Sequence, residues 1–163
     1  EDMEGTAQSG FRTTWGQATT APRDLIAVTE DWLAGAGADV DVVEPGLIRV
    51  PMDTDGQQWI LLVRVDVEAS VVGFYSVLPS MVPEPARHEV AHFLISQNFD
   101  LLFGSFEMDP EDGEVRFRTA WAGGPDELPT DAQFYELVAP HAPLVSAHIP
   151  AVDKLITEVL TRG

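Results

Sequence analysis

Four candidate strands follow one another closely between residues 39 and 78, and they constrain the fold more than any other feature. They span Asp39 to Glu44, Leu47 to Asp53, Gln57 to Glu68 and Val71 to Leu78. The connections are short: Pro45-Gly46, Asp53-Thr54-Asp55-Gly56 and Ala69-Ser70. A parallel connection needs a dozen or more residues, whereas antiparallel strands can be joined by a tight turn. The sequence therefore predicts an antiparallel meander.

The third candidate strand predicts which side of the sheet is buried. Because side chains alternate along a strand, one face carries Trp59, Leu61, Val63, Val65 and Val67. We expect this face to form the core. The other face is apolar at Ile60 and Leu62, and we place Phe74 of the next strand beside them. Such a patch predicts a dimer or partner surface, unless the N-terminal arm or a C-terminal helix covers it.

Helical patterns flank these strands. Leu25, Val28 and Trp32 mark an amphipathic helix that ends at Gly35 and Gly37. A second helix is expected from about Pro85 to Asn98, followed by a hairpin of residues 101–109 and 114–121. The element order predicts the α+β class, with helices packed on an antiparallel sheet in the order α-β-β-β-(β)-α-β-β-α.

Prolines divide the predicted C-terminal region. Thr130 can cap a short helix, and Pro140 and Pro143 are expected to interrupt it. Pro150 is expected to open a last helix, because proline is favoured in the first turn.

The chain is expected to form one domain. Residues 1–19 are rich in Gly, Thr, Ser and Gln without any period, which predicts an arm, and residues 20–163 form the domain. The longest aliphatic or aromatic run is Trp59 to Val63, far short of the roughly 20 residues that a membrane span needs. The first residues lack the pattern of a signal peptide, so we expect a cytoplasmic protein.

Charge is the strongest bias of the composition. The chain has 27 Asp and Glu against 9 Lys and Arg, for a net charge of -18. This charge disfavours direct binding to nucleic acids or anionic membranes. It favours a basic protein partner, although acidity also serves solubility.

The segment His88-Glu89-Val90-Ala91-His92 matches the HExxH pattern of zinc peptidases. Two imidazoles one turn apart can bind Zn²⁺ while the glutamate activates its water. The extended metzincin pattern fails, since Ile95 and Asn98 stand where Gly and His are required. A helical wheel turns His88 and His92 away from the apolar stripe, which favours a surface pair.

Other candidate ligands give no recognisable metal site. Glu107, Asp109, Glu111 and Glu114 belong to the predicted hairpin, and His141 and His148 to a Pro-rich connection. The chain has no cysteine, no Walker loop and no GxSxG elbow. We therefore expect no enzyme activity, no catalytic or metal-binding residues and no cofactor.

The region from Leu78 to Phe117 resembles the YbjN family of bacterial proteins. The resemblance is carried by Leu78-Pro79, Val82-Pro83-Glu84, Arg87, Glu89-Val90, Asn98, Gly104, Phe106-Glu107-Met108-Asp109 and Asp112-Gly113-Glu114-Val115-Arg116-Phe117. It is clearest over residues 59–121. It implies a fold like that of type III secretion chaperones, which are acidic homodimers that hold protein clients. It also implies a sensory or stress-related role without an established enzymatic activity.

These observations favour a non-enzymatic, chaperone-like or protein-binding module. We expect a homodimer that binds a protein partner of basic character, of the kind that handles nucleic acid. The second helix, through Ala91, His92 and Ile95, is the first candidate for the dimer or partner surface. Ile60, Leu62 and Phe74 are the second. The alternative is a small zinc hydrolase that uses His88, His92 and Glu89.

Overall fold

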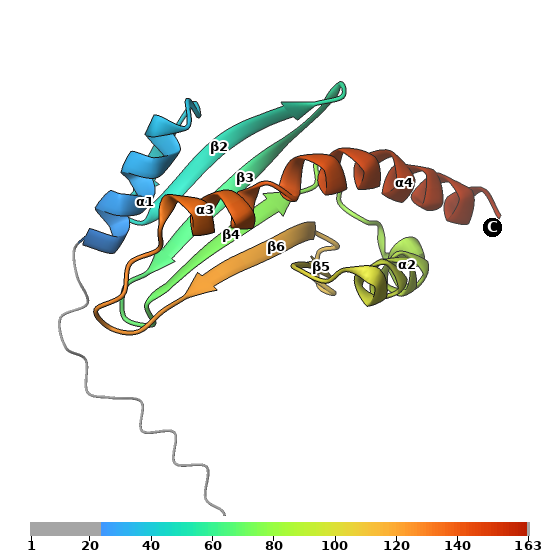
Figure 1. Cartoon of the computed structure of the whole chain (residues 1–163). Coiled ribbons are helices and arrows are strands. Elements are labelled where there is room, and N and C mark those ends of the chain that lie inside the picture. The colour runs from blue at the N-terminus through green and yellow to red at the C-terminus, as the bar shows by residue number, and fades with distance from the viewer. Residues whose placement is uncertain (1–23, 163) are drawn as a thin grey trace, which may run out of the picture.

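A computed structural model describes residues 24–162 and shows one antiparallel sheet with helices on one of its faces (Figure 1). The helices are α1 (Asp24–Gly35), the 3₁₀ turn η1 (Glu84–Ala86), α2 (Arg87–Asp100), α3 (Asp131–Val138) and α4 (His141–Thr161). The strands are β1 (Asp41–Glu44), β2 (Leu47–Thr54), β3 (Gln57–Asp66), β4 (Val71–Val77), β5 (Ser105–Met108) and β6 (Val115–Ala122). The predicted α+β class and element order are confirmed. The boundary predicted between residues 19 and 20, and the arm itself, lie outside the described residues.

The strand order in the sheet is β1-β2-β3-β4-β6-β5, and every neighbouring pair is antiparallel. The tight turn between β2 and β3 has positive φ at Asp55 and Gly56, as a type I′ hairpin requires. The meander predicted from the short turns is therefore confirmed, and the β5–β6 hairpin is added beyond β4.

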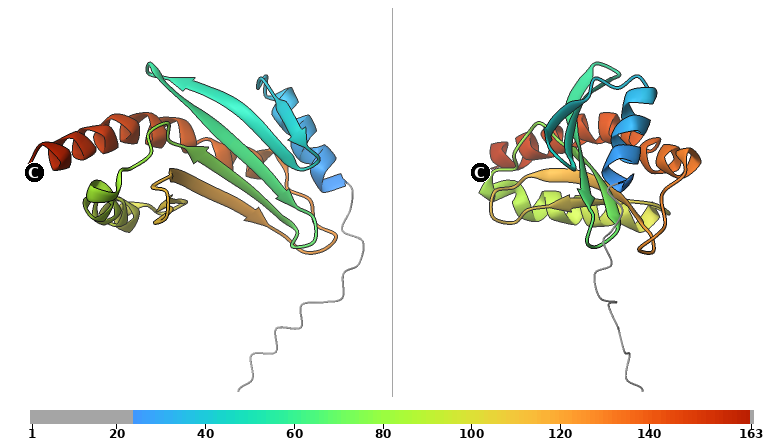
Figure 2. Two further views of the ribbon diagram at one scale, coloured as in Figure 1. Left: turned by 180° about the vertical axis from the view of Figure 1, so that it is seen from behind. Right: turned by 90° about the vertical axis from the view of Figure 1, so that its left-hand side faces the viewer.

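One face of the sheet is buried beneath α1, α3 and α4, while α2 lies beside β5. The alternation predicted for β3 is confirmed, because Trp59, Leu61, Val63 and Val65 are all buried. Seen from behind, the strands lie in front of α3 and α4 (Figure 2, left). We call this second side the open face, since no described helix covers it.

Phe74 lies on the covered face, and the prediction that it borders Ile60 and Leu62 is wrong. Phe74 pairs with Val63 and is fully buried. The reason is the connection between β3 and β4, which leaves four residues between the paired Asp66 and Val71. An even number of loop residues places odd positions of one strand opposite even positions of the next.

The outcome at the C-terminus also differs from the prediction, because α4 is continuous from His141 to Thr161. Pro140 is its N-cap and Pro143 lies in its first turn, where backbone N–H groups have no intrahelical partner anyway. Pro150 lies inside the helix at the loss of one backbone hydrogen bond. The helix persists because its apolar stripe, including Val145, Ile149 and Val152, packs into the core.

A chain of hydrogen bonds around His141 joins the helices to the sheet. Trp59 Nε1 donates to Ser76 Oγ at 2.9 Å, and Ser76 Oγ lies 2.8 Å from His141 Nδ1. On the other side, His141 Nε2 lies 2.9 Å from Thr119 Oγ1, which donates to the Leu137 carbonyl at 2.8 Å. The Trp59 N–H can only donate and the Leu137 carbonyl can only accept. The Ser76 hydroxyl therefore donates to Nδ1 of His141, and Nε2 donates to the Thr119 hydroxyl. The neutral ring with its proton on Nε2 thus satisfies all four bonds.

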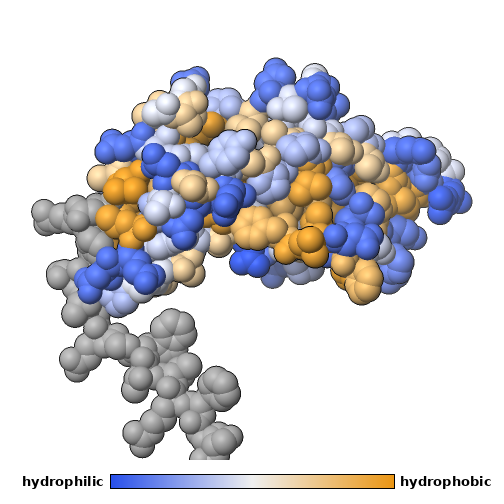
Figure 3. Space-filling model, in the orientation of Figure 1, coloured by the Kyte–Doolittle hydropathy of each residue, from blue (hydrophilic) through white to orange (hydrophobic). Residues whose placement is uncertain are grey.

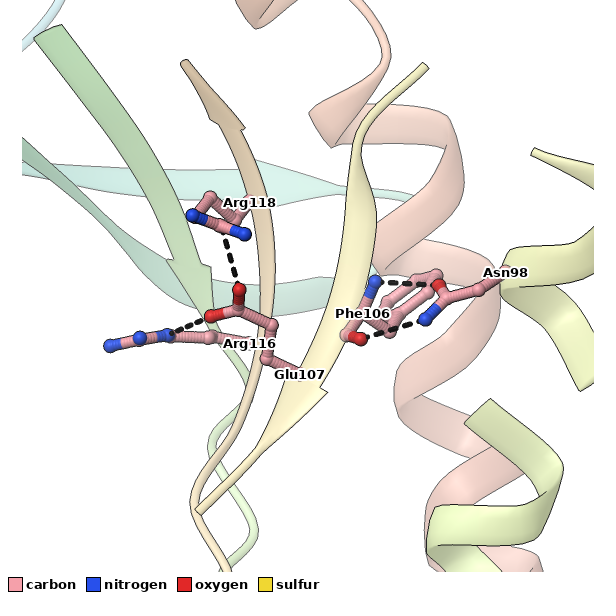
Figure 4. A network of polar contacts seen from close by, with 5 residues as sticks. All are labelled: Asn98, Phe106, Glu107, Arg116 and Arg118. Carbon is pink, nitrogen blue, oxygen red and sulfur yellow. Dashed lines mark hydrogen bonds and ion pairs between the residues drawn. The ribbon is translucent and has the colours of Figure 1, made fainter. Parts of the chain in front are cut away.

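Asn98 fixes the end of α2 to the edge strand β5 (Figure 4). Its amide Nδ2 donates to the Phe106 carbonyl at 2.9 Å, and its Oδ1 accepts from the Phe106 N–H at 2.7 Å. The side chain thus mimics the backbone of a neighbouring strand and pairs both edge groups. Gly104 permits the close approach that follows, with a φ of 77° and the Phe117 ring in the place of a side chain.

Acid should destabilise the fold through His141. Burial lowers the pKa of His141 from 6.5 to about 4, because the charged ring would lose its hydration. Between these values the unfolded chain binds a proton that the folded chain does not, so the free energy of unfolding falls as pH falls from 6.5 to 4. The loss should reach about 3 kcal/mol. Urea unfolding at several pH values, compared with His141→Leu, isolates this contribution. If the free energy of unfolding falls equally steeply with pH in both proteins, His141 is not the cause of the acid sensitivity.

Removal of the Asn98 amide should release the edge of β5. Asn98→Ala is expected to lower the free energy of unfolding by about 1–3 kcal/mol, because the two Phe106 backbone groups lose their partners. The amide hydrogen of Phe106 should also exchange faster. Ser96→Ala is the matched control: the exposed Ser96 hydroxyl only bonds the His92 carbonyl. An unchanged exchange rate at Phe106 in Asn98→Ala would show that the pairing does not protect this edge.

Candidate protein-binding surface

The first predicted contact surface lies on α2, which faces two ways. Val90 and Leu94 are buried against the core, as the helical wheel indicates. On the opposite side, His92 and Ile95 are exposed and Ala91 is partly buried. The structure thus leaves the three predicted residues accessible, and their role in a dimer or partner contact stays a prediction.

An exposed apolar cluster extends this side of α2 to the end of the helix and beyond. Ile95 is 68% exposed, Phe99 90%, Leu102 103% and Phe103 48%. On the side shown in Figure 3, apolar surface gathers below α4, over α2 and β5. Single exposed apolar residues are ordinary, whereas four within nine consecutive positions indicate a contact surface. We call these four residues the α2 cluster.

Three members of the α2 cluster were not predicted from the sequence: Phe99, Leu102 and Phe103. Phe99 could have been found, since it continues the i, i+4 row that begins at Ala91 and Ile95. Leu102 and Phe103 lie beyond the helix, where helical spacing says nothing about exposure. Whether these two side chains are buried or exposed depends on the tertiary structure alone.

The second predicted surface, on the open face, is only partly as expected. Ile60 and Leu62 lie on it and are partly buried, but Phe74 does not. Their cross-strand neighbours are instead Val77 and Tyr75, respectively. The open face therefore has an apolar row of different composition from the one predicted.

The HExxH histidines do not assemble a metal centre within residues 24–162. His88, Glu89 and His92 line a hollow of about 490 Å³ between α2 and α4, together with Phe93, Ser96 and Leu155. The described part of the chain contains no group of three or more His, Cys, Asp or Glu placed to hold a metal ion. Nothing in this hollow therefore favours the zinc hydrolase.

Three of the remaining candidate ligands, Glu107, His141 and His148, have structural roles. Glu107 binds two arginines on the open face. His141 and His148 belong to α4 and not to a Pro-rich connection between helices, so that prediction is wrong. His148 lies 2.7 Å from the Leu144 carbonyl through Nδ1, and its ring packs 4.3 Å from that of Phe106.

The strongest perturbed pKa in the described chain also belongs to the core. A perturbed group in a cleft is a candidate for catalysis. The pKa of His141 is lowered by burial, and both of its ring nitrogens are engaged by Ser76 and Thr119. This arrangement stabilises the contact between α4 and the sheet, and it offers no free nitrogen to a substrate.

None of the helices in residues 24–162 combines the length and the apolar content that crossing a bilayer requires.

Comparison with known proteins shows a relationship at the level of the fold. No family model matches the sequence, and no curated protein matches it. Among solved structures, the chain is similar to the crystal structure of YbjN from E. coli, described as "a putative transcription regulator". The TM-score is 0.50 at 14% sequence identity, and the match covers 82% of this chain and 86% of that chain. The chain therefore shares the fold of E. coli YbjN, as the resemblance in its sequence implied.

Proposed function

We propose that this chain is a non-enzymatic, chaperone-like or protein-binding module that works as a homodimer in the cytoplasm. The observation that carries the proposal is the α2 cluster, an apolar surface without a covering element among the described residues. Burial of apolar surface contributes roughly 25 cal/mol per Å², so a partner that covers these side chains gains the main driving force of association.

The α2 cluster suits a contact between two copies of the chain. Ala91, Ile95 and Phe99 share one side of a helix, and a two-fold axis can bring the same row of a second copy against it. The chain carries a net charge of -18, so two copies repel each other over much of their surface. Contact through these apolar side chains brings few charges together, and Asp100, the last residue of α2, is the acidic neighbour of Phe99.

The partner is proposed to be a basic protein. The acidic surface attracts such a protein and speeds the encounter, while apolar contacts hold the complex. A protein that handles nucleic acid fits this description. The description of E. coli YbjN as "a putative transcription regulator" supports a place in regulation. The resemblance to the YbjN family adds stress response as the proposed setting.

Substitutions in the α2 cluster should weaken the dimer without unfolding the monomer. Phe99→Gln with Leu102→Gln removes two side chains that are 90% and 103% exposed, so the folded monomer loses little. We expect the dissociation constant to rise by about 10- to 100-fold. Light scattering over a concentration series measures it. Leu160→Gln, on an exposed residue of α4, is the matched control. A wild-type mass of one chain at all concentrations would remove the dimer proposal.

A basic partner should be captured in a salt-dependent way. The wild-type chain is used as bait in nuclease-treated bacterial lysate at about 0.1 M and about 1 M salt, where charges are screened over roughly 10 Å and 3 Å. We expect basic proteins to be enriched at the lower salt and lost at the higher, with identification by mass spectrometry. The Phe99→Gln, Leu102→Gln protein should retain less of the same proteins. Enrichment of acidic proteins only would contradict the proposed partner class.

A further inference from the structure

The open face gathers most of the positive charge of the described chain. Two of the nine Lys and Arg residues, Arg12 and Arg23, lie outside residues 24–162. Four of the other seven lie on the open face: Arg49, Arg64, Arg116 and Arg118. Five acidic side chains of the strands share that face, namely Asp41, Glu44, Asp53, Asp66 and Glu107. The strands of the open face thus carry five acidic against four basic side chains, a far smaller acidic excess than that of the whole chain, whose net charge is -18.

Two of these arginines are held side by side by one carboxylate (Figure 4). Glu107 Oε2 accepts from Arg116 Nε at 2.9 Å, and its Oε1 lies 2.7 Å from Arg118 Nε. Both contacts use only the Nε groups, and no described residue accepts from the terminal amino groups of either guanidinium. The side chains of Arg116 and Arg118 remain about half exposed, at 42% and 45%.

Tyr75 fixes the position of Arg116 further. The guanidinium carbon of Arg116 lies 4.8 Å from the centre of the Tyr75 ring, in cation–π geometry. The ring in turn lies against Gly73, where its atoms come within 2.6 Å of the place that a Cβ would take. The ring can lie there only because residue 73 has no side chain. Glu107 and Tyr75 thus both hold the guanidinium of Arg116 in place in the absence of a ligand.

An apolar groove begins next to the arginine pair. Ile60, Val77 and Arg116 lie in one cross-strand row, with Val77 directly opposite Arg116. The groove has a volume of about 620 Å³ and is lined mainly by apolar residues, among them Pro51, Ile60, Val77, Pro79 and Met81. This volume is in the range of sites that hold several side chains of a ligand. The exposed thioether of Met81 suits a surface that adapts to ligands of different shape.

We propose that the open face binds one peptide segment of the basic partner protein, a segment in which an acidic residue adjoins apolar residues. The carboxylate accepts hydrogen bonds from the terminal amino groups of Arg116 and Arg118, and the apolar side chains fill the groove beside Val77. Arginine is suited to this task because its planar fork matches a carboxylate. The proposal rests on the protein-binding function above and names the segment that is bound.

The net charge of the chain does not prevent this contact. At physiological ionic strength, charges on the surface are screened over about 8 Å, so the carboxylates of the helices act weakly at the open face. The arginine pair is adjacent to the bound group and acts at hydrogen-bond distance. A second copy of this chain is a weaker candidate occupant, because it would bring a second net charge of -18 against this face.

A displayed library of random twelve-residue peptides tests the proposal. Selection on the wild-type chain should enrich sequences with Asp or Glu next to Leu, Ile, Met or aromatic residues. A fluorescein-labelled peptide from the enriched set is then titrated by fluorescence anisotropy. We expect Arg116→Gln with Arg118→Gln to weaken its binding at least about 10-fold. Replacement of its acidic residue by Gln or Asn should have a similar effect.

The matched control loses the same charge elsewhere on the open face. Arg49→Gln with Arg64→Gln should change binding less than about twofold, since screening limits the reach of each charge. Equal urea unfolding midpoints of the two double variants exclude a folding defect.

No enrichment of peptides, a basic consensus sequence or equal weakening of binding by both double variants would overturn the site. Loss of the dimer in Arg116→Gln, Arg118→Gln would assign the open face to a second copy and overturn it too. Selected peptides that bind but ignore Arg116 and Arg118 would remove this site and leave the protein-binding function standing.

Discussion

Burial of one face of the sheet is the constraint on which the rest of the structure depends. Trp59, Leu61 and Val63 alternate with Ile60 and Leu62 along β3, so covering the first set with helices turns the second set outward. The second face stays open, because α1, α3 and α4 all pack on the same side of the sheet. Both the open face and the exposed side of α2 follow from this one-sided arrangement (Figure 2).

The His141 network keeps two halves of the core in register. One apolar cluster gathers α1, α3 and the middle of the sheet, and the other gathers η1, α2, α4 and the β5–β6 hairpin. His141 lies between β4 and β6, bonded to Ser76 and Thr119. Apolar contacts alone tolerate small displacements, whereas a directional chain of hydrogen bonds selects one arrangement. A polar residue in the core thus specifies how α4 lies on the sheet.

Sequence patterns predicted the strands well and the contacts between elements less well. Alternation and turn residues located β2, β3 and β6 within a few positions, because these signals act between near neighbours. The face of Phe74 was assigned wrongly, since it depends on the length of a turn and on pairing across strands. The break predicted at Pro140 and Pro143, with a new helix from Pro150, was wrong for a related reason: local propensity disfavours proline inside a helix, and packing against the core overrides it.

For the site residues too, local patterns indicate which way a side chain faces and not which residues it contacts. Side chains alternate along a strand, so Arg116 and Arg118 share one face of β6, yet only the pairing of β5 with β6 brings Glu107 between them. The two histidines of the HExxH pattern were correctly placed away from the core, because that orientation follows from helical period alone. The absence of a third ligand near them within residues 24–162 depends on the tertiary structure.

Pairing of Asn98 with Phe106 has a consequence for the behaviour of the chain at high concentration. A sheet grows into a cross-β fibril by adding strands at an unpaired edge. The amide of Asn98 occupies that edge at β5. The opposite edge, β1, has four residues, a register shift next to Glu44 and an acidic side chain at each end. Neither edge of the described sheet offers a long template for a further strand, so growth of a fibril from these edges is disfavoured.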